Sequence, residues 1–248
     1  MSDLSAAARA DLAPSGKLRV GLNFGNTQLT ARDPVTRVPT GGIAVDLAHE
    51  LGRRLGVPLE IVPYESAGAL ADAASTGAWA VGFLGVEPQR AKEISFTAPY
   101  VDLETTYLVP PNSPLRTIAD VDREGVRIAL PAKSAFDLYL IRTLKHATLV
   151  RAQGSPAAFK LFVSENLDAL AGLRQMLLPD QQNFPGSRLL EGYFTLVHQG
   201  VGTPKGHDAG AKYLHEFVED VKASGLVARV IEKNGIRGAL VAPKAATA

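Results

Sequence analysis

Apolar residues recur along the first part of the chain with two different periods. Between residues 43 and 55 they fall every three or four positions and Gly56 follows, which predicts an amphipathic helix ended by a left-handed glycine. The run 78–85 is apolar throughout, as is typical of a parallel strand covered on both faces. The predicted order is strand 17–22, helix 43–55, strand 58–64, helix 66–76 and strand 78–85.

This alternation predicts a doubly wound α/β layer, and it begins again after Pro111. The second series consists of strand 125–130, helix 134–147, strand 148–152, helix 155–166, strand 167–172, strand 193–202 and helices 208–223 and 226–233. The polar segment 178–188 predicts a surface loop between the last two strands. Because the pattern restarts, we expect two α/β lobes.

The amino-acid composition excludes several classes of function. Hydrophobic residues make up 46% of the chain, enough for a sizeable core. The 26 Lys and Arg residues balance 25 Asp and Glu residues, so no nucleic-acid partner is expected. No apolar stretch approaches the roughly 18 residues of a membrane span, so direct membrane insertion is not expected. The absence of cysteine excludes disulfides and thiolate chemistry. The 5 histidines show no metal-binding spacing and no phosphate-binding glycine loop is present, so we expect no metal and no cofactor.

The N-terminal segment has neither the basic start nor the apolar core of a signal peptide. As the sequence is written, we therefore expect a cytoplasmic protein. If a signal sequence has been removed from it, we expect a periplasmic one.

Several strings of the sequence resemble one family, the two-lobed solute-binding proteins of the polar amino acid type, which are receptors of bacterial uptake transporters. The most specific string is WAVGFLGVEPQRAKEISFTAPYV, at residues 79–101. The resemblance implies a type II periplasmic-binding-protein-like fold with a ligand cleft between two α/β lobes. The implied division is an N-terminal extension at 1–16, lobe 1 at 17–106 and 201–236, lobe 2 at 107–200, and a flexible tail at 237–248.

Arg90 occupies the position at which this family holds the ligand's carboxylate. A guanidinium stays protonated, and its planar fork matches two carboxylate oxygens. The resemblance therefore implies that Arg90 binds a carboxylate. Gly85 replaces the usual Thr or Ser and offers only its backbone N–H, and Glu87 lies beside the arginine. The alternative is an ion pair of Arg90 with Glu87 or Glu93 on a solvated turn.

The long polar loop 23–42 follows the first strand and is a candidate functional loop. Asn23 and Asn26 stand where the family often has an acid and an aromatic residue, and their amides suit a polar, non-cationic ligand. Ser66 or Glu65 stands where an aromatic ring often stacks on the ligand in this family. The alternative for the asparagines is that they only cap the loop.

In the second lobe, Ser134 is a predicted N-cap, and Lys133 precedes it. A helix N-terminus with a nearby cation suits an anion, whereas a capped helix with a solvated lysine is the alternative. Leu173 stands where the family usually has the aspartate that binds the ligand's ammonium, and Arg174 follows it. These departures predict a preference for small carboxylates or other anions over α-amino acids.

The resulting prediction is a non-catalytic solute-binding protein for a small carboxylate-bearing or anionic ligand. Its expected partners are the small-molecule ligand and the permease of a membrane transporter. One alternative is an enzyme on the same scaffold, such as a cyclohexadienyl-type dehydratase, with Glu87 or Glu65 as its general acid. The other alternative is a ligand-sensing module.

Overall fold

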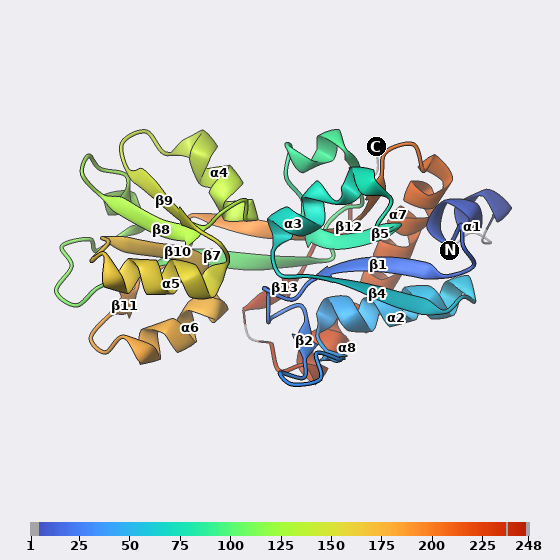
Figure 1. Cartoon of the computed structure of the whole chain (residues 1–248), viewed down its shortest axis with the longest axis horizontal. Helices are drawn as coiled ribbons and strands as arrows, with labels where there is room; N and C mark the ends of the chain where they lie inside the picture. The colour runs from blue at the N-terminus through green and yellow to red at the C-terminus, as the bar shows by residue number, and fades with distance from the viewer. Residues whose placement is uncertain (1–4, 237, 247–248) are drawn as a thin grey trace. The chain divides into compact units, whose positions relative to one another are not determined.

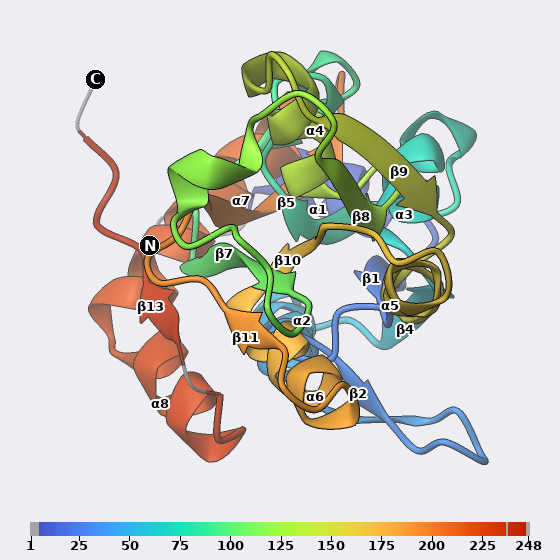
Figure 2. The ribbon, with the colours of Figure 1, turned by 90° about the vertical axis from the view of Figure 1, so that its left-hand side faces the viewer.

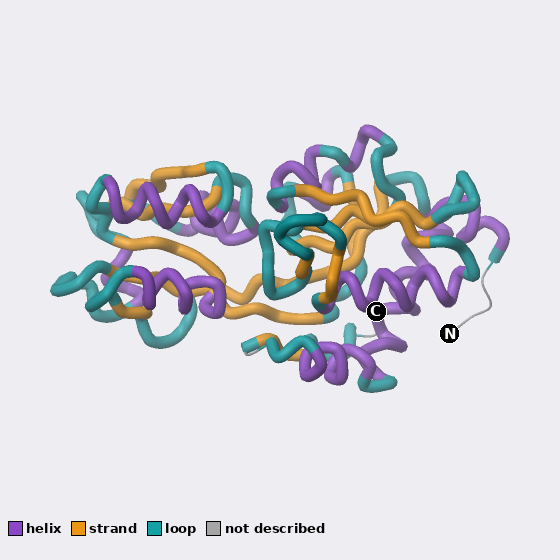
Figure 3. Tube along the Cα trace, turned by 60° about the horizontal axis from the view of Figure 1, so that its bottom comes forward, coloured by secondary structure: helices purple, strands orange, loops and turns teal. Residues whose placement is uncertain are grey.

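The computed structural model describes residues 5–236 and 238–246, which form two compact units. Unit 1 contains the described residues up to Asp102 and those from His198 onward, and unit 2 spans Leu103–Val197. In each unit the strands, orange in Figure 3, are accompanied by helices, shown in purple. The restart of the hydrophobic pattern therefore predicted the division into two α/β units.

The sheet of unit 1 is built on three parallel strands. The order is β4 (Leu59–Tyr64), β1 (Leu18–Asn23) and β5 (Val81–Gly85), with β12 (Thr195–Pro204) antiparallel to β5. Every residue of β5 is buried, as its uninterrupted apolar sequence predicted. Because the three strands are parallel, their carboxyl ends meet at one edge of this sheet.

Helices cover this sheet of unit 1 (Figure 1). α2 (Ile43–Leu55) contacts β1 and β4, and α3 (Ala67–Asp72) contacts β1, β4 and β5. The bounds of α2 are those predicted, and Gly56 ends it with φ of 62°, a conformation that favours glycine. The apolar stripe of α2 is buried, which is why its periodicity identified the helix correctly.

The terminal helices also belong to unit 1. α7 (Asp208–Ala223) and α8 (Leu226–Lys233) have the predicted bounds. α1 (Ala6–Leu12) packs against α7, and Leu12 is completely buried. The described residues of the expected N-terminal extension, from Ser5 onward, therefore pack within unit 1.

Unit 2 has the strand order β7 (Val101–Val109), β10 (Ala169–Leu173), β8 (Arg127–Pro131) and β9 (Thr148–Ala152). β10 and β8 are parallel, β8 and β9 are parallel, and β10 is antiparallel to β7. α5 (Ser155–Ser164) contacts β8, β9 and β10 (Figure 2). α4 (Ala135–Thr143) follows β8.

Strands β7 and β12 carry the chain across the boundary between the units. The predicted crossings, after residues 106 and 200, lie within the same two strands. The hydrogen-bonded order β4-β1-β5-β12-β7-β10-β8-β9 passes through both of them. The prediction that a ligand binds between the lobes stays a prediction.

Two segments differ from their prediction. The loop expected at 178–188 is largely helical, because α6 (Arg174–Asn183) continues through Pro179 and buries Leu177 in the core of unit 2. Tertiary packing here outweighs the low helix propensity of proline. Within the expected tail, Ala239–Val241 form β13, which pairs with β7, and Ala242 is buried. Residues 237, 247 and 248 of that tail lie outside the described residues.

Short strands complete the fold. Within the loop after β1, β2 (Ala31–Arg32) and β3 (Pro39–Gly41) form a small antiparallel pair. β6 (Ile94–Phe96) pairs with β12, and β11 (Arg188–Leu189) pairs with β7. Over the described ranges, none of the helices is both long and apolar enough to span a membrane.

Candidate functional site

The predicted site residues of unit 1 lie on segments that leave the carboxyl ends of its parallel strands. Asn23 is the last residue of β1, Ser66 follows β4, and Gly85 is the last residue of β5. Arg90 follows Gly85 in the chain and begins a short 3-10 helix, Arg90–Lys92. The parallel sheet therefore gathers these segments at the edge where α/β folds place ligands.

Arg90 is buried, with only 6% of its surface exposed. Its Nη1 donates a hydrogen bond of 2.7 Å to the backbone carbonyl of Gly85. Burial lowers the pKa of the guanidinium to about 10, while the nearby negative charge of Glu87 opposes the decrease. The guanidinium is therefore protonated at neutral pH in surroundings with little water, where its attraction for an anion is strengthened.

The burial of Arg90 and its neighbours can be compared with the alternative, an ion pair of Arg90 with Glu87 or Glu93 on a solvated turn. Glu87 is itself buried, at 9% exposure, and its charge acts on Arg90. Both of these side chains are therefore buried, whereas Pro88 and Gln89 between them are exposed. Glu93 is exposed. The role of Arg90 toward a carboxylate ligand stays a prediction.

Asn23 and Asn26 organise the loop after β1. The side-chain oxygen of Asn23 accepts a hydrogen bond from Gly25 N at 2.9 Å, and that of Asn26 accepts one from Gln28 N at 3.2 Å. Thr30 Oγ1 donates to the backbone carbonyls of both asparagines. The side-chain oxygens of both asparagines therefore cap the loop, as the alternative interpretation predicted. Contact of these asparagines with a ligand stays a prediction.

Ser66 also has a local role. Its hydroxyl accepts a hydrogen bond from Ala69 N at 3.2 Å and caps the N-terminus of α3, as the sequence predicted. A hydroxyl that already caps a helix has less capacity to bind a solute. Its proposed part in ligand binding is not tested by this geometry.

Glu65 lies next to this edge in a cluster that was not predicted. Arg32 binds its carboxylate with two hydrogen bonds of 2.9 and 2.6 Å, and Arg37 adds one of 2.8 Å. The Arg32 guanidinium also lies over the Phe24 ring, 5.0 Å from its centroid. The hydrogen bonds and positive charges of Arg32 and then Arg37 lower the pKa of Glu65. A carboxyl group held ionised in this way is a poor general acid.

The helix N-terminus predicted as an anion site in unit 2 contains a carboxylate of the protein. Ser134 caps α4 by accepting from Asp137 N at 3.1 Å. Asp137 is 2% exposed, and its carboxylate accepts from Lys133 N at 2.8 Å and from Arg151 Nε at 3.0 Å. Asp137 therefore already binds the backbone N–H of Lys133, and a role of Lys133 and Ser134 in binding an anion stays a prediction. The Lys133 side chain is exposed.

Arg174 is also held by the protein. Its Nε donates to Glu104 Oε2 at 3.0 Å, and its Nη2 donates to the carbonyl of Gly192. Its side chain is 22% exposed. Glu104 therefore neutralises the charge of Arg174 in this geometry, and the role of Arg174 toward a ligand stays a prediction. Leu173, the residue before it, is buried.

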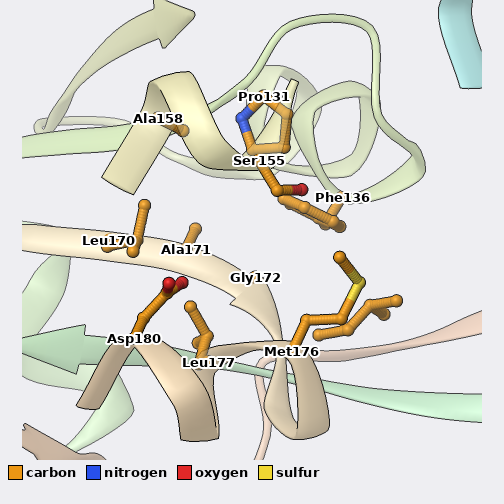
Figure 4. Close-up of a pocket in the computed structure, with 11 residues that line it drawn as sticks. Pro131, Phe136, Ser155, Ala158, Leu170, Ala171, Gly172, Met176, Leu177 and Asp180 are labelled. Carbon is orange, nitrogen blue, oxygen red and sulfur yellow. The ribbon is translucent and has the colours of Figure 1, made fainter. Parts of the chain in front are cut away.

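A pocket within unit 2 was missed by the sequence analysis (Figure 4). β10 forms one wall, and the other walls come from the segments after β8 and β9 and from α6. Among the residues that line it, Asp180 carries the one titratable side chain. Asp180 was not predicted as a site residue, because its polar stretch of sequence resembles a surface loop. The spacing of Leu173, Leu177 and Asp180 on one helical face could have indicated otherwise.

The described residues contain no group of three or more His, Asp or Glu side chains that could hold a metal ion. Arginine side chains or backbone N–H groups bind the carboxylates of Glu65, Glu104 and Asp137. The site residues are therefore suited to recognising a small polar solute by hydrogen bonds and charge.

Comparisons with known proteins agree with this architecture. Residues 25–235 match the family described as bacterial extracellular solute-binding proteins, family 3. A search of curated protein sequences finds no match. Solved structures nevertheless resemble the chain over most of its length.

One such structure is the ancestral amino acid-binding protein AncCDT-1, a precursor of cyclohexadienyl dehydratase. It has 22% sequence identity and a TM-score of 0.75, covering 92% of this chain and 99% of that one. A mutant of ArgBP from T. maritima has 23% identity and a TM-score of 0.76, covering 91% and 98%.

A third is the amino acid ABC transporter substrate-binding protein AbpA from Streptococcus pneumoniae, bound to L-arginine. It has 19% identity and a TM-score of 0.74, covering 90% of this chain and 96% of that one. At these identities the likeness shows the fold, which is the type II periplasmic-binding architecture. With the family match across most of its sequence, the chain belongs to the bacterial extracellular solute-binding proteins, family 3.

Proposed function

We propose that this protein is the ligand receptor of an ABC-type uptake transporter and that Arg90 holds a carboxylate group of its solute. The observation that carries the proposal is the buried guanidinium of Arg90, beside the carboxyl end of β5. An ionised carboxylate can accept two parallel N–H bonds from a guanidinium, and such bonds strengthen where water is excluded. The burial of Arg90 supports this role.

The proposed ligand class is small carboxylates, α-amino acids included. The preference for anions over amino acids depended on extra cations in unit 2. Glu104 neutralises Arg174, and Asp137 binds the N–H of Lys133. That preference therefore loses support. Two similar solved structures are complexes with amino acids, one with lysine and one with L-arginine, which favours including them.

We propose binding without catalysis. Of the two carboxyl groups considered as a general acid, Glu65 is kept ionised by Arg32 and Arg37. A dehydratase would need a group that donates a proton near neutral pH, and Glu65 does not suit that role. A transporter permease is the partner that this proposal requires.

A thermal-denaturation screen tests the proposal. The twenty amino acids and a series of small mono- and dicarboxylates are added to the purified protein. A ligand present at 100 times its Kd should stabilise the folded state by about 2.7 kcal/mol. We expect at least one of these compounds to do so, and uncharged amides of the same compounds to fail.

Variants at Arg90 complete the test. Arg90→Ala should abolish the response to the carboxylate, and Arg90→Lys tests the need for the planar fork if the alanine variant does not fold. Arg116→Ala is the matched control, because Arg116 is an exposed arginine of unit 2. An Arg90→Ala protein that folds and responds like the parent would contradict the proposal.

A further inference from the structure

The pocket of unit 2 has walls that are almost entirely apolar. Its lining residues are Pro131, Phe136, Ser155, Ala158, Leu170, Ala171, Gly172, Leu173, Met176, Leu177 and Asp180. Figure 4 shows Met176 reaching toward Phe136 and the Asp180 carboxyl directed from α6 toward β10. The polar side chains of the lining are therefore those of Ser155 and Asp180.

Asp180 is an unusual residue for such a place. Within the part of the chain that the structure describes, no hydrogen bond or ion pair joins its carboxyl to another residue. Partial burial raises the pKa of Asp180 to about 6, and no positive charge counteracts that rise. An ionised carboxylate here lacks the partner that buried charges normally have.

The size of the pocket restricts what can bind there. Its free volume is about 30 Å³, room for about two water molecules. A primary ammonium group with a short alkyl chain fits that space, whereas a quaternary ammonium group does not. A metal ion would find too few oxygen ligands, because Asp180 supplies the one carboxylate of the lining.

We propose that this pocket binds a small primary alkylammonium group, with Asp180 as its counter-ion. The carboxylate supplies charge and hydrogen-bond acceptors, and the Ser155 hydroxyl supplies a further acceptor. The Phe136 ring and the Met176 thioether suit both an alkyl chain and a cation. An anion would be repelled by Asp180, and a neutral group would leave its charge unpaired. The inference is independent of the carboxylate proposed to bind Arg90.

The test follows the titration of Asp180 by carbon-13 NMR of its side-chain carboxyl. Ethylammonium chloride is the probe, and sodium chloride at the same ionic strength is the reference. A cation bound beside the carboxylate should lower the pKa of Asp180 by about one unit. Tetramethylammonium chloride is the size control and should behave like sodium chloride.

Variants provide the second arm of the test. Asp180→Asn should weaken ethylammonium binding at pH 7.5 by about tenfold or more, measured by chemical-shift perturbation of unit 2 amides. The variant should fold, because burial already favours the uncharged form of this side chain. Glu124→Gln, at an exposed carboxyl of the same unit, should leave binding unchanged.

Three results would each overturn the proposal. The first is an equal pKa of Asp180 in ethylammonium chloride and in sodium chloride. The second is an equal lowering of that pKa by tetramethylammonium and by ethylammonium. The third is ethylammonium binding by Asp180→Asn that is as strong as that of the parent. The first would mean that water alone hydrates Asp180. Loss of carboxylate binding in Arg90 variants bears on the proposed function alone.

Discussion

Arg90 in unit 1 and Arg174 in unit 2 both follow the end of a buried strand, yet their guanidinium groups differ in burial and in hydrogen-bond partners. Arg174 forms an ion pair of 3.0 Å with Glu104 and is 22% exposed. Arg90 is more deeply buried, and its guanidinium donates to the backbone carbonyl of Gly85. Both were predicted from sequence to attract an anion, and for both residues that role stays a prediction.

The difference shows that position in a fold does not decide what an arginine can bind. Arg174 forms an ion pair with Glu104, so the positive charge of Arg174 stabilises the structure of the protein. The pKa of Arg90 is lowered by burial, which means that its charge is poorly hydrated. A poorly hydrated cation gains more from a bound anion than a solvated one does.

The largest expected effect concerns Asp137, whose carboxylate binds the backbone N–H of Lys133 near the N-terminus of α4. Asp137→Ala should destabilise the protein by about 3 kcal/mol, because it removes a buried acceptor from Lys133 N and Arg151. Urea denaturation measures this change. Glu60→Gln, in an exposed ion pair of unit 1, should change stability by less than about 1 kcal/mol. Equal effects would show that Asp137 is not structural.

The next effect concerns the pair formed by Arg174 and Glu104. Single replacements by Ala and the double replacement form a double-mutant cycle. The coupling should be about 1–2 kcal/mol, since the two side chains are only partly exposed. A coupling near zero would mean that Glu104 does not hold Arg174, and the contrast with Arg90 would then weaken.

The smallest effect is a pH dependence at Asp180. Its pKa is raised from 3.8 to about 6 in the folded state, so folding favours the protonated form. The resulting stabilisation is complete below pH 3.8 and is lost as the pH rises through 6. At pH 7.5 Asp180→Asn should therefore be more stable than the parent by about 1 kcal/mol, after allowance for solvent screening.

Thermal denaturation at pH 3.5 and pH 7.5 checks this difference, in the absence of amines. The stabilising effect of Asp180→Asn should shrink at the lower pH. A variant that is less stable than the parent at pH 7.5 would indicate an ionised Asp180 with a favourable partner.

Most of the fold could be predicted from the sequence because its helices and strands bury continuous stripes of apolar residues. α2, α7 and α8 have the predicted bounds, since each combines helical periodicity with clear end signals such as Gly56. α6 was not predicted, because Pro179 and its polar neighbours resemble a loop and outweigh the weaker signal of helical spacing. Its helix is held by the burial of Leu177, a tertiary contact that local sequence does not reveal.

The candidate site was less predictable for a related reason. Residue type identifies a side chain that can bind an anion, but not the partner that it already has. Glu104 is far from Arg174 in the sequence, and the two meet because β7 and β10 are neighbours in the sheet. Ser134, by contrast, caps α4 through a local bond, and the sequence predicted it correctly.

Calorimetric titration of the two arginine variants tests the central claim most directly. The strongest carboxylate ligand from the screen is titrated into the parent, Arg90→Lys and Arg174→Lys. Lysine keeps the charge and loses the planar fork, so Arg90→Lys should raise Kd by about tenfold or more, and Arg174→Lys should leave it within about twofold. Weaker binding by Arg174→Lys, with Arg90→Lys unchanged, would contradict the account.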